Sequence, residues 1–133
     1  MSSIDESADE VIFPLENSEP VFRGLRASWY VEGEIDPVAF IRRPSPKDEK
    51  GLSVDMRCEM EHIYSSFSCK AIAGLITEAV VAIEQLNIEP DEPQHANITG
   101  LPYREDDEKL AEDLASALTD LCYVAWEKPK KIS

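Results

Sequence analysis

The feature that most constrains the fold is an amphipathic pattern near the C-terminus. Acidic residues precede it at 105–108, lysines follow it, and Pro129 lies just beyond. Acids at the start and cations at the end of a helix both interact favourably with its dipole, and proline ends a helix. The segment is therefore predicted to be a long helix with one face buried against another layer. Its apolar residues at helical spacing are Leu110, Leu114, Ala117, Leu118, Leu121 and Ala125.

The rest of the chain contains short apolar runs typical of strands. They lie at 21–25, 52–55, 69–76 and 94–99, and a short helix is predicted from residue 77 to about 86. A second helix is predicted over 56–67, because Met56, Met60, Ile63 and Phe67 recur at helical spacing. We therefore expect an α+β fold, with a small mixed or antiparallel sheet of about four to five strands. The C-terminal helix and the 56–67 helix are expected to cover one face of it.

The first twenty residues differ in composition from the rest. Residues 1–20 carry six acids and no base, with few apolar side chains to bury. They are predicted to form a mobile acidic N-terminal tail, followed by a single α+β domain over 21–133. A chain of 133 residues is long enough for one core without disulfides, and its three cysteines are widely spaced. No signal-peptide pattern is visible, so a cytoplasmic protein is expected.

The net charge of −14 restricts the classes of partner. A nucleic-acid binder needs excess cations to neutralise phosphates, so none is expected as a ligand, and no apolar run is long enough to span a membrane. A basic protein partner is expected instead, because dense carboxylates complement basic surfaces. A homodimer without ligand is a further alternative. The acids predicted to contact a partner are Glu105, Asp106, Glu108, Glu112 and Asp113.

Two functions are therefore considered. The first is a non-catalytic interaction protein of the inhibitor, immunity or accessory type. It is preferred because the sequence contains no nucleophile elbow, phosphate loop or dinucleotide fingerprint, and no cofactor is expected. The second is a nucleotide-binding enzyme or enzyme remnant that uses Arg23, Ser53 and His95. In it the arginine would bind a phosphate or ribose edge and the serine hydroxyl would support the pocket.

The segments Phe22-Arg23-Gly24 and Gly51-Leu52-Ser53-Val54-Asp55 faintly resemble the opening of ADP-ribosyltransferase-like folds. The resemblance covers about eight residues. It implies a late catalytic glutamate, for which Glu105 is the nearest candidate, although Glu105 falls in the first turn of the predicted helix.

A broader resemblance includes these two segments, Ala39-Phe40, and the segment from His95 to Pro102. Together with the Ala/Leu-rich helix, this order is similar to a group of small uncharacterised bacterial proteins, over roughly Val21 to Leu118. It implies a compact bacterial domain and no particular activity.

Metal ligands were also considered. Cys58 and His62 are four residues apart and would share an exposed helix face, and a zinc site would need Cys69 and His95 to complete it. This spacing matches no common zinc pattern, so no metal is expected.

Overall fold

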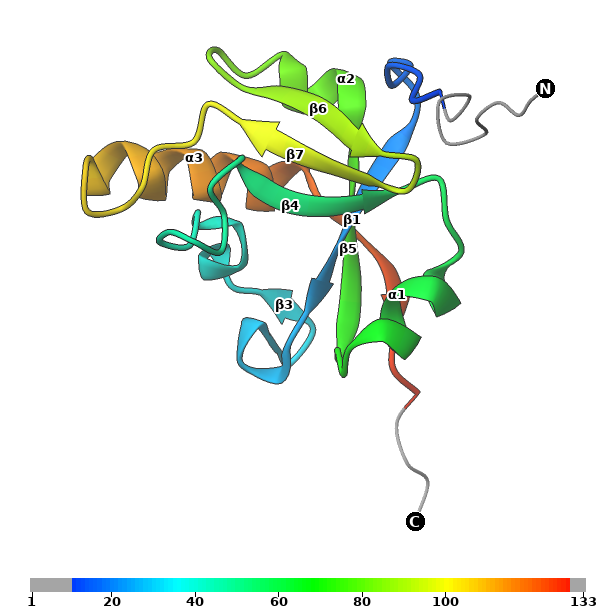
Figure 1. The fold of residues 1–133 in the computed structure, drawn as a ribbon. Coiled ribbons are helices and arrows are strands. Elements are labelled where there is room, and N and C mark those ends of the chain that lie inside the picture. Colours follow the sequence, from blue (N-terminus) through cyan, green and yellow to red (C-terminus); the bar gives the residue numbers. More distant parts are fainter. Residues whose placement is uncertain (1–10, 130–133) are drawn as a thin grey trace, which may run out of the picture.

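The computed structural model describes residues 11–129, and its centre is a six-stranded antiparallel sheet with strand order β6-β7-β4-β1-β5-β8 (Figure 1). The strands of this sheet are β1 (Pro20–Leu25), β4 (Leu52–Met56), β5 (Ala71–Ile76), β6 (Asn87–Glu92), β7 (His95–Thr99) and β8 (Tyr123–Glu127). A separate two-stranded ribbon consists of β2 (Tyr30–Val31) and β3 (Glu34–Ile35). The helices are α1 (Met60–Ser66), α2 (Thr77–Val81) and α3 (Glu108–Leu121), with 3₁₀ turns η2 (Ala27–Trp29) and η3 (Pro37–Phe40). The predicted α+β fold is confirmed.

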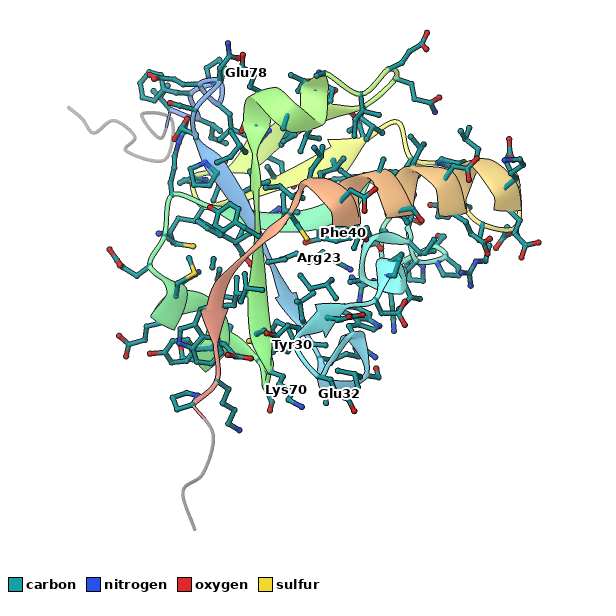
Figure 2. The ribbon with its side chains drawn as sticks, turned by 180° about the vertical axis from the view of Figure 1, so that it is seen from behind. Arg23, Tyr30, Glu32, Phe40, Lys70 and Glu78 are labelled. Carbon is teal, nitrogen blue, oxygen red and sulfur yellow. The ribbon has the colours of Figure 1, made fainter. Side chains whose placement is uncertain are left out.

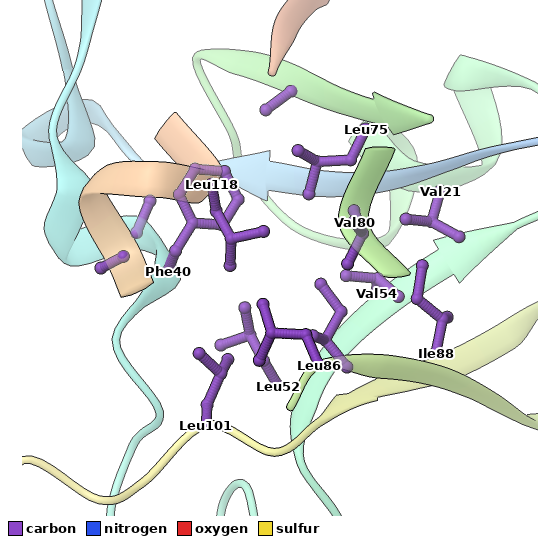
Figure 3. Packing of buried hydrophobic residues seen from close by; sticks show 14 of the residues in the cluster. Val21, Phe40, Leu52, Val54, Leu75, Val80, Leu86, Ile88, Leu101 and Leu118 are labelled. Atoms are coloured by element: carbon purple, nitrogen blue, oxygen red, sulfur yellow. The ribbon is translucent and has the colours of Figure 1, made fainter. Parts of the chain in front are cut away.

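The main hydrophobic core lies between one face of the sheet and the elements α2, α3 and η3 (Figure 3). In β4, Leu52, Val54 and Met56 are buried and alternate with half-buried residues, which is the period of two expected of a strand with one face in the core. Phe40 from η3 and Leu118 from α3 are fully buried in the same cluster. This face of the sheet is therefore covered along most of its width.

A smaller apolar cluster lies on the opposite face of the sheet. Phe22 of β1 and Ile72 of β5 pack there with Ile63 of α1. The two helices therefore cover opposite faces, whereas both were predicted to cover one. The reason is that β1 and β5 carry apolar residues in consecutive positions, so each face of these two strands has its own apolar set.

The predicted C-terminal helix is confirmed over Glu108–Leu121 but ends earlier than expected. Asp107 begins it, because its side chain accepts a hydrogen bond from the Leu110 amide at 3.1 Å. The residues that follow, including Ala125, form β8, which pairs with β5. Their composition favours a strand, and Trp126 of β8 stacks on Tyr64 of α1 with ring centroids 4.4 Å apart. The helical spacing of Ala125 was therefore coincidental.

The predicted 56–67 helix begins later than its apolar spacing indicated. Met56 is the last residue of β4, and Arg57 has a positive φ of 53° that turns the chain out of the strand. The helix begins only at Met60. Cys58 lies before the helix, so the predicted helical face shared by Cys58 and His62 does not exist.

The segment preceding β1 contacts the domain through Arg57. The Arg57 guanidinium donates to the carbonyls of Phe13 and Pro14 and forms an ion pair with Glu19 at 2.7 Å. Thr77 at the start of α2 donates its hydroxyl to the Glu19 carbonyl. The mobile tail was predicted over 1–20. Residues 1–10 lie outside the described residues, and these contacts involve only the part of that segment from residue 11 onward.

The Glu19–Arg57 pair predicts a pH dependence of stability. The hydrogen bond from Arg57, with help from the Glu16 amide, lowers the pKa of Glu19 to about 2. A lowered pKa in the folded state stabilises the protein above the usual value of 4.5, and this contribution is lost as the pH falls towards 2. Glu19→Gln should therefore cost about 1 kcal/mol or less at neutral pH. The difference from wild type should shrink below pH 4.5 in urea titrations. A difference that is constant with pH would contradict this role of the charge.

Candidate functional site

A cluster of polar side chains lies on the sheet face opposite the main core, on the half that contains β4 and β7. The strand period turns Ser53 and Asp55 of β4 away from the core, and the same holds for His95 and Asn97 of β7. The register pairs Ser53 with Asn97 and Asp55 with His95 across the two strands. These four side chains therefore share one patch of the sheet, beside the half that α1 covers.

Three of the side chains in this region form a continuous hydrogen-bonded chain. Ser53 Oγ lies 2.5 Å from His95 Nε2, and His95 Nδ1 lies 2.6 Å from Asp91 Oδ1. Asn97 donates from Nδ2 to the other carboxylate oxygen of Asp91 at 3.1 Å. Asp91 reaches this position because the pairing of β6 with β7 shifts register between Pro90 and Glu92. A one-residue irregularity of this kind re-aims a side chain relative to a regular strand.

The charge on Asp91 determines which ring nitrogen of His95 carries a proton. Burial raises the pKa of Asp91, but the hydrogen bonds from His95 and Asn97 outweigh it and hold the pKa below its usual value. Asp91 is therefore ionised at neutral pH and can only accept hydrogen bonds. In a neutral imidazole beside this carboxylate, His95 Nδ1 carries the proton and Nε2 can accept the Ser53 hydroxyl proton. This is the arrangement of a nucleophile, a general base and an orienting acid.

Arg23 is the third residue that the sequence singled out, and it lies close to Ser53. Its side chain is 7 % exposed and stands on the core side of β1 (Figure 2). Its Nε donates to the carbonyl of Ala39 in η3, and its Nη1 donates to the carbonyl of Ser53 at 2.7 Å. The guanidinium therefore holds η3 against β4. Burial and the nearby Arg43 lower the pKa of Arg23 to about 10, so Arg23 is still charged at neutral pH.

A pocket of about 290 Å³ opens where Arg23 meets Ser53. It lies between the sheet, the end of α1 and the segment after β1. We call it the arginine pocket, and its lining residues are Arg23, Gly24, Arg26, Trp29, Arg43, Ser53, Asp55 and Phe67. Burial raises the pKa of Asp55, the acidic residue among them. The chain of Ser53, His95 and Asp91 thus ends at the wall of a pocket with three guanidinium groups.

The structure therefore places Ser53 in contact with both Arg23 and His95, which lie far from it in the sequence. Asp91 was missed by the sequence analysis. The prolines and acids of residues 87–93 indicate only a turn or an edge strand, with no role for this particular acid. The available signal was an acid four residues before His95, with the turn Pro93-Gln94 of the β6–β7 hairpin between them. Glu105 lines a different pocket, with Tyr103 and Glu108, and not the arginine pocket.

The acids predicted to contact a partner lie at and before the start of α3. Two of them are paired within the protein: Glu112 lies 3.5 Å from Arg104, and Asp113 lies 2.8 Å from Lys109. Glu105, Asp106 and Glu108 are exposed. Binding of a basic partner to this surface stays a prediction.

The residues considered for zinc do not form a cluster. Within residues 11–129, the structure contains no group of three or more His, Cys, Asp or Glu side chains that could hold a metal ion. Cys69 is buried beside Ile72, and Cys58 is half-buried against the same apolar cluster. Burial, with Asp55 and Glu59 nearby, raises the pKa of the Cys58 thiol to about 11. Cys58 is therefore protonated at neutral pH and a poor metal ligand or nucleophile.

Comparison with known proteins identifies no relative: no protein-family model, no curated protein and no solved structure matches the chain. The two resemblances described from the sequence stay predictions. None of the helices within residues 11–129 has the length and apolar character needed to cross a membrane.

Proposed function

We propose that this protein is a small serine hydrolase, in which Ser53 is the nucleophile, His95 the general base and Asp91 the residue that orients His95. The observation that supports this proposal is the hydrogen-bonded chain from Ser53 Oγ through both nitrogens of His95 to Asp91. A serine hydroxyl is a weak nucleophile unless a base accepts its proton, and the Nε2 of a correctly oriented histidine is such a base. The nucleotide-binding enzyme predicted from the sequence uses Ser53 and His95 as well, but as parts of a nucleotide pocket and not as nucleophile and base.

The reaction would proceed in two steps on an ester. First, His95 Nε2 takes the Ser53 proton while Oγ bonds to the ester carbonyl carbon. The bond from that carbon to the alcohol oxygen then breaks, and the departing oxygen takes the proton from His95. In the second step water gives a proton to His95 and bonds to the acyl carbon, and Ser53 leaves with that proton. The balance is ester and water to acid and alcohol.

Two further features support this assignment. Asn97 donates to the second oxygen of Asp91, which helps to hold the carboxylate beside His95. The Arg23 guanidinium donates to the main-chain carbonyl of Ser53 at 2.7 Å, and both residues line the arginine pocket. A positive charge in this pocket would stabilise the oxyanion that forms on the substrate carbonyl when the hydroxyl attacks.

The test is covalent labelling of the native protein with an alkyl fluorophosphonate. This reagent bonds through phosphorus to an activated serine oxygen and releases fluoride. We expect labelling of Ser53, identified by mass spectrometry of the modified peptide, and no labelling of this site in Ser53→Ala. Because general-base assistance contributes roughly 10²–10⁴-fold, His95→Ala should slow the labelling at least about hundredfold. Hydrolysis of p-nitrophenyl butyrate should fall in parallel.

Two matched controls separate this chemistry from general reactivity. Ser66→Ala removes an exposed serine whose hydroxyl donates to the His62 carbonyl and not to an imidazole. His62→Ala removes the other histidine of the chain, which is exposed on α1. Both should label at Ser53 like wild type. The hydrolase proposal fails if Ser53 is not modified, or if His95→Ala and His62→Ala label at equal rates.

A further inference from the structure

From the arginine pocket, we infer that the substrate is an ester carrying a phosphate group, and that Arg26, Arg43 and Arg23 bind this phosphate beside Ser53. The choice of an ester rests on the proposed hydrolase, whereas the phosphate site stands on the pocket alone. Three guanidinium groups gather there in a chain whose net charge is −14. Like charges in one pocket repel each other, and a bound anion would offset this repulsion.

Contacts within the protein hold each of the three arginines in place. Arg26 stacks on Trp29 with its guanidinium carbon 4.5 Å from the ring centroid, and Arg23 approaches the same ring at 5.3 Å. Arg43 is fixed by Asp48, whose side chain is fully buried and accepts from both Nε and Nη2 of Arg43 at 3.0 Å. The guanidinium groups are therefore positioned before any ligand arrives, which lowers the entropy cost of binding.

The positive charge of this pocket is only partly neutralised by the protein. Among residues 11–129, Arg43 has an ion pair, but neither Arg23 nor Arg26 has one. Arg23 is also nine-tenths buried, and within the same residues its Nη2 has no hydrogen-bond acceptor. Asp55 is the single carboxylate in the lining. A buried charge without a partner is costly, so an anion with several acceptor oxygens would be stabilised here.

Phosphate fits these donors better than a carboxylate does. It offers three terminal oxygens and a charge near −2, and the planar fork of Arg26 can bind it with two parallel hydrogen bonds. Nη2 of Arg23 and Nη1 of Arg43 are further donors, because the other nitrogens of these two groups donate within the protein. Trp29 and Phe67 add aromatic surface to the same pocket, and Phe67 is 45 % exposed. The group attached to the phosphate is therefore expected to have an apolar or aromatic part. Ser53 lies in the wall of the pocket, so the bound ester would be next to the nucleophile.

The test is calorimetric titration of the full chain with phenyl phosphate, which combines the anion with an aromatic ring. We expect saturable binding to wild type and at least about tenfold weaker binding to Arg26→Gln, because a charge-assisted hydrogen bond contributes about 1.5–3 kcal/mol. Arg26→Lys, which keeps the charge without the fork, should fall in between. Arg26 is exposed, so these variants should fold.

The matched control is Arg104→Gln, which removes an arginine that pairs with Glu112 outside the pocket. It should bind phenyl phosphate like wild type, and phenol should not bind. Equal losses in Arg26→Gln and Arg104→Gln, or no binding to wild type, would overturn the phosphate site. Labelling of Ser53 without phenyl phosphate binding would leave the hydrolase standing and refute the substrate class. Binding of phenyl phosphate without labelling of Ser53 would leave the phosphate site standing and refute the hydrolase.

Discussion

Asp91→Asn is expected to slow fluorophosphonate labelling of Ser53 by about 10²–10⁴-fold while leaving the protein folded. The reason is the proton on His95. The Asp91 carboxylate accepts from Nδ1 and so leaves Nε2 free for the Ser53 proton. An amide at position 91 can instead donate to Nδ1, and the neutral imidazole would then carry its proton on Nε2, where it blocks transfer from Ser53.

Asn97 strengthens this expectation. Its Nδ2 donates to the outer oxygen of residue 91 at 3.1 Å. In Asp91→Asn this contact favours the amide orientation whose oxygen faces Asn97 and whose NH₂ group faces His95. The neighbouring side chain thus selects the rotamer that disables the base, and the loss should be larger in Asp91→Asn than in the double variant with Asn97→Ala.

Glu92→Gln is the matched control, because it makes the same chemical change one residue further along β6. Glu92 is exposed and pairs with His95 only through the strand register. Labelling rates for both variants should be measured beside urea unfolding curves. If the two variants label Ser53 equally fast and are equally stable, Asp91 does not orient His95, and the role assigned to this carboxylate is wrong.

The strands could be predicted from the sequence where alternation or a buried apolar run is present. The predicted strands 21–25, 52–55 and 94–99 correspond to β1, β4 and β7. Errors occurred where a helical spacing appeared by chance. Ala125 and Met56 matched helical periods, but Ala125 belongs to the edge strand β8 and Met56 closes the strand β4. Both residues are in strands because a neighbouring strand pairs with their segment. A local sequence pattern does not show which strands will pair.

The candidate site could be predicted only in part for a related reason. Alternation puts Ser53 and Asp55 on one face of a strand, and a histidine that opens another strand is visible in the sequence. That β4 and β7 are neighbours, with Ser53 opposite Asn97, depends on strand order. Asp91 depends in addition on the register shift between Pro90 and Glu92, which no composition rule identifies.

The largest stability effect is expected for Phe40→Ala, which should reduce the free energy of unfolding by about 3–5 kcal/mol. Phe40 ends η3, is fully buried, and packs in the same cluster as Leu118 of α3 (Figure 3). Removing its ring leaves a cavity between these elements. For a domain of this size the loss corresponds to a fall of roughly 10–25 °C in Tm.

Phe13→Ala is the control for Phe40→Ala. It makes the same chemical change, but Phe13 is 64 % exposed, so its removal should hardly change the free energy of unfolding.

Phe40→Ala should also affect the arginine pocket. The carbonyl of Ala39, next to Phe40, accepts from Arg23 Nε, so a loosened η3 releases one of the two contacts that aim Arg23. Folded Phe40→Ala should therefore bind phenyl phosphate more weakly than Phe13→Ala does. If Phe40→Ala is as stable as Phe13→Ala, η3 does not depend on this side chain for its packing. If instead it is destabilised but binds phenyl phosphate normally, the position of Arg23 does not depend on η3.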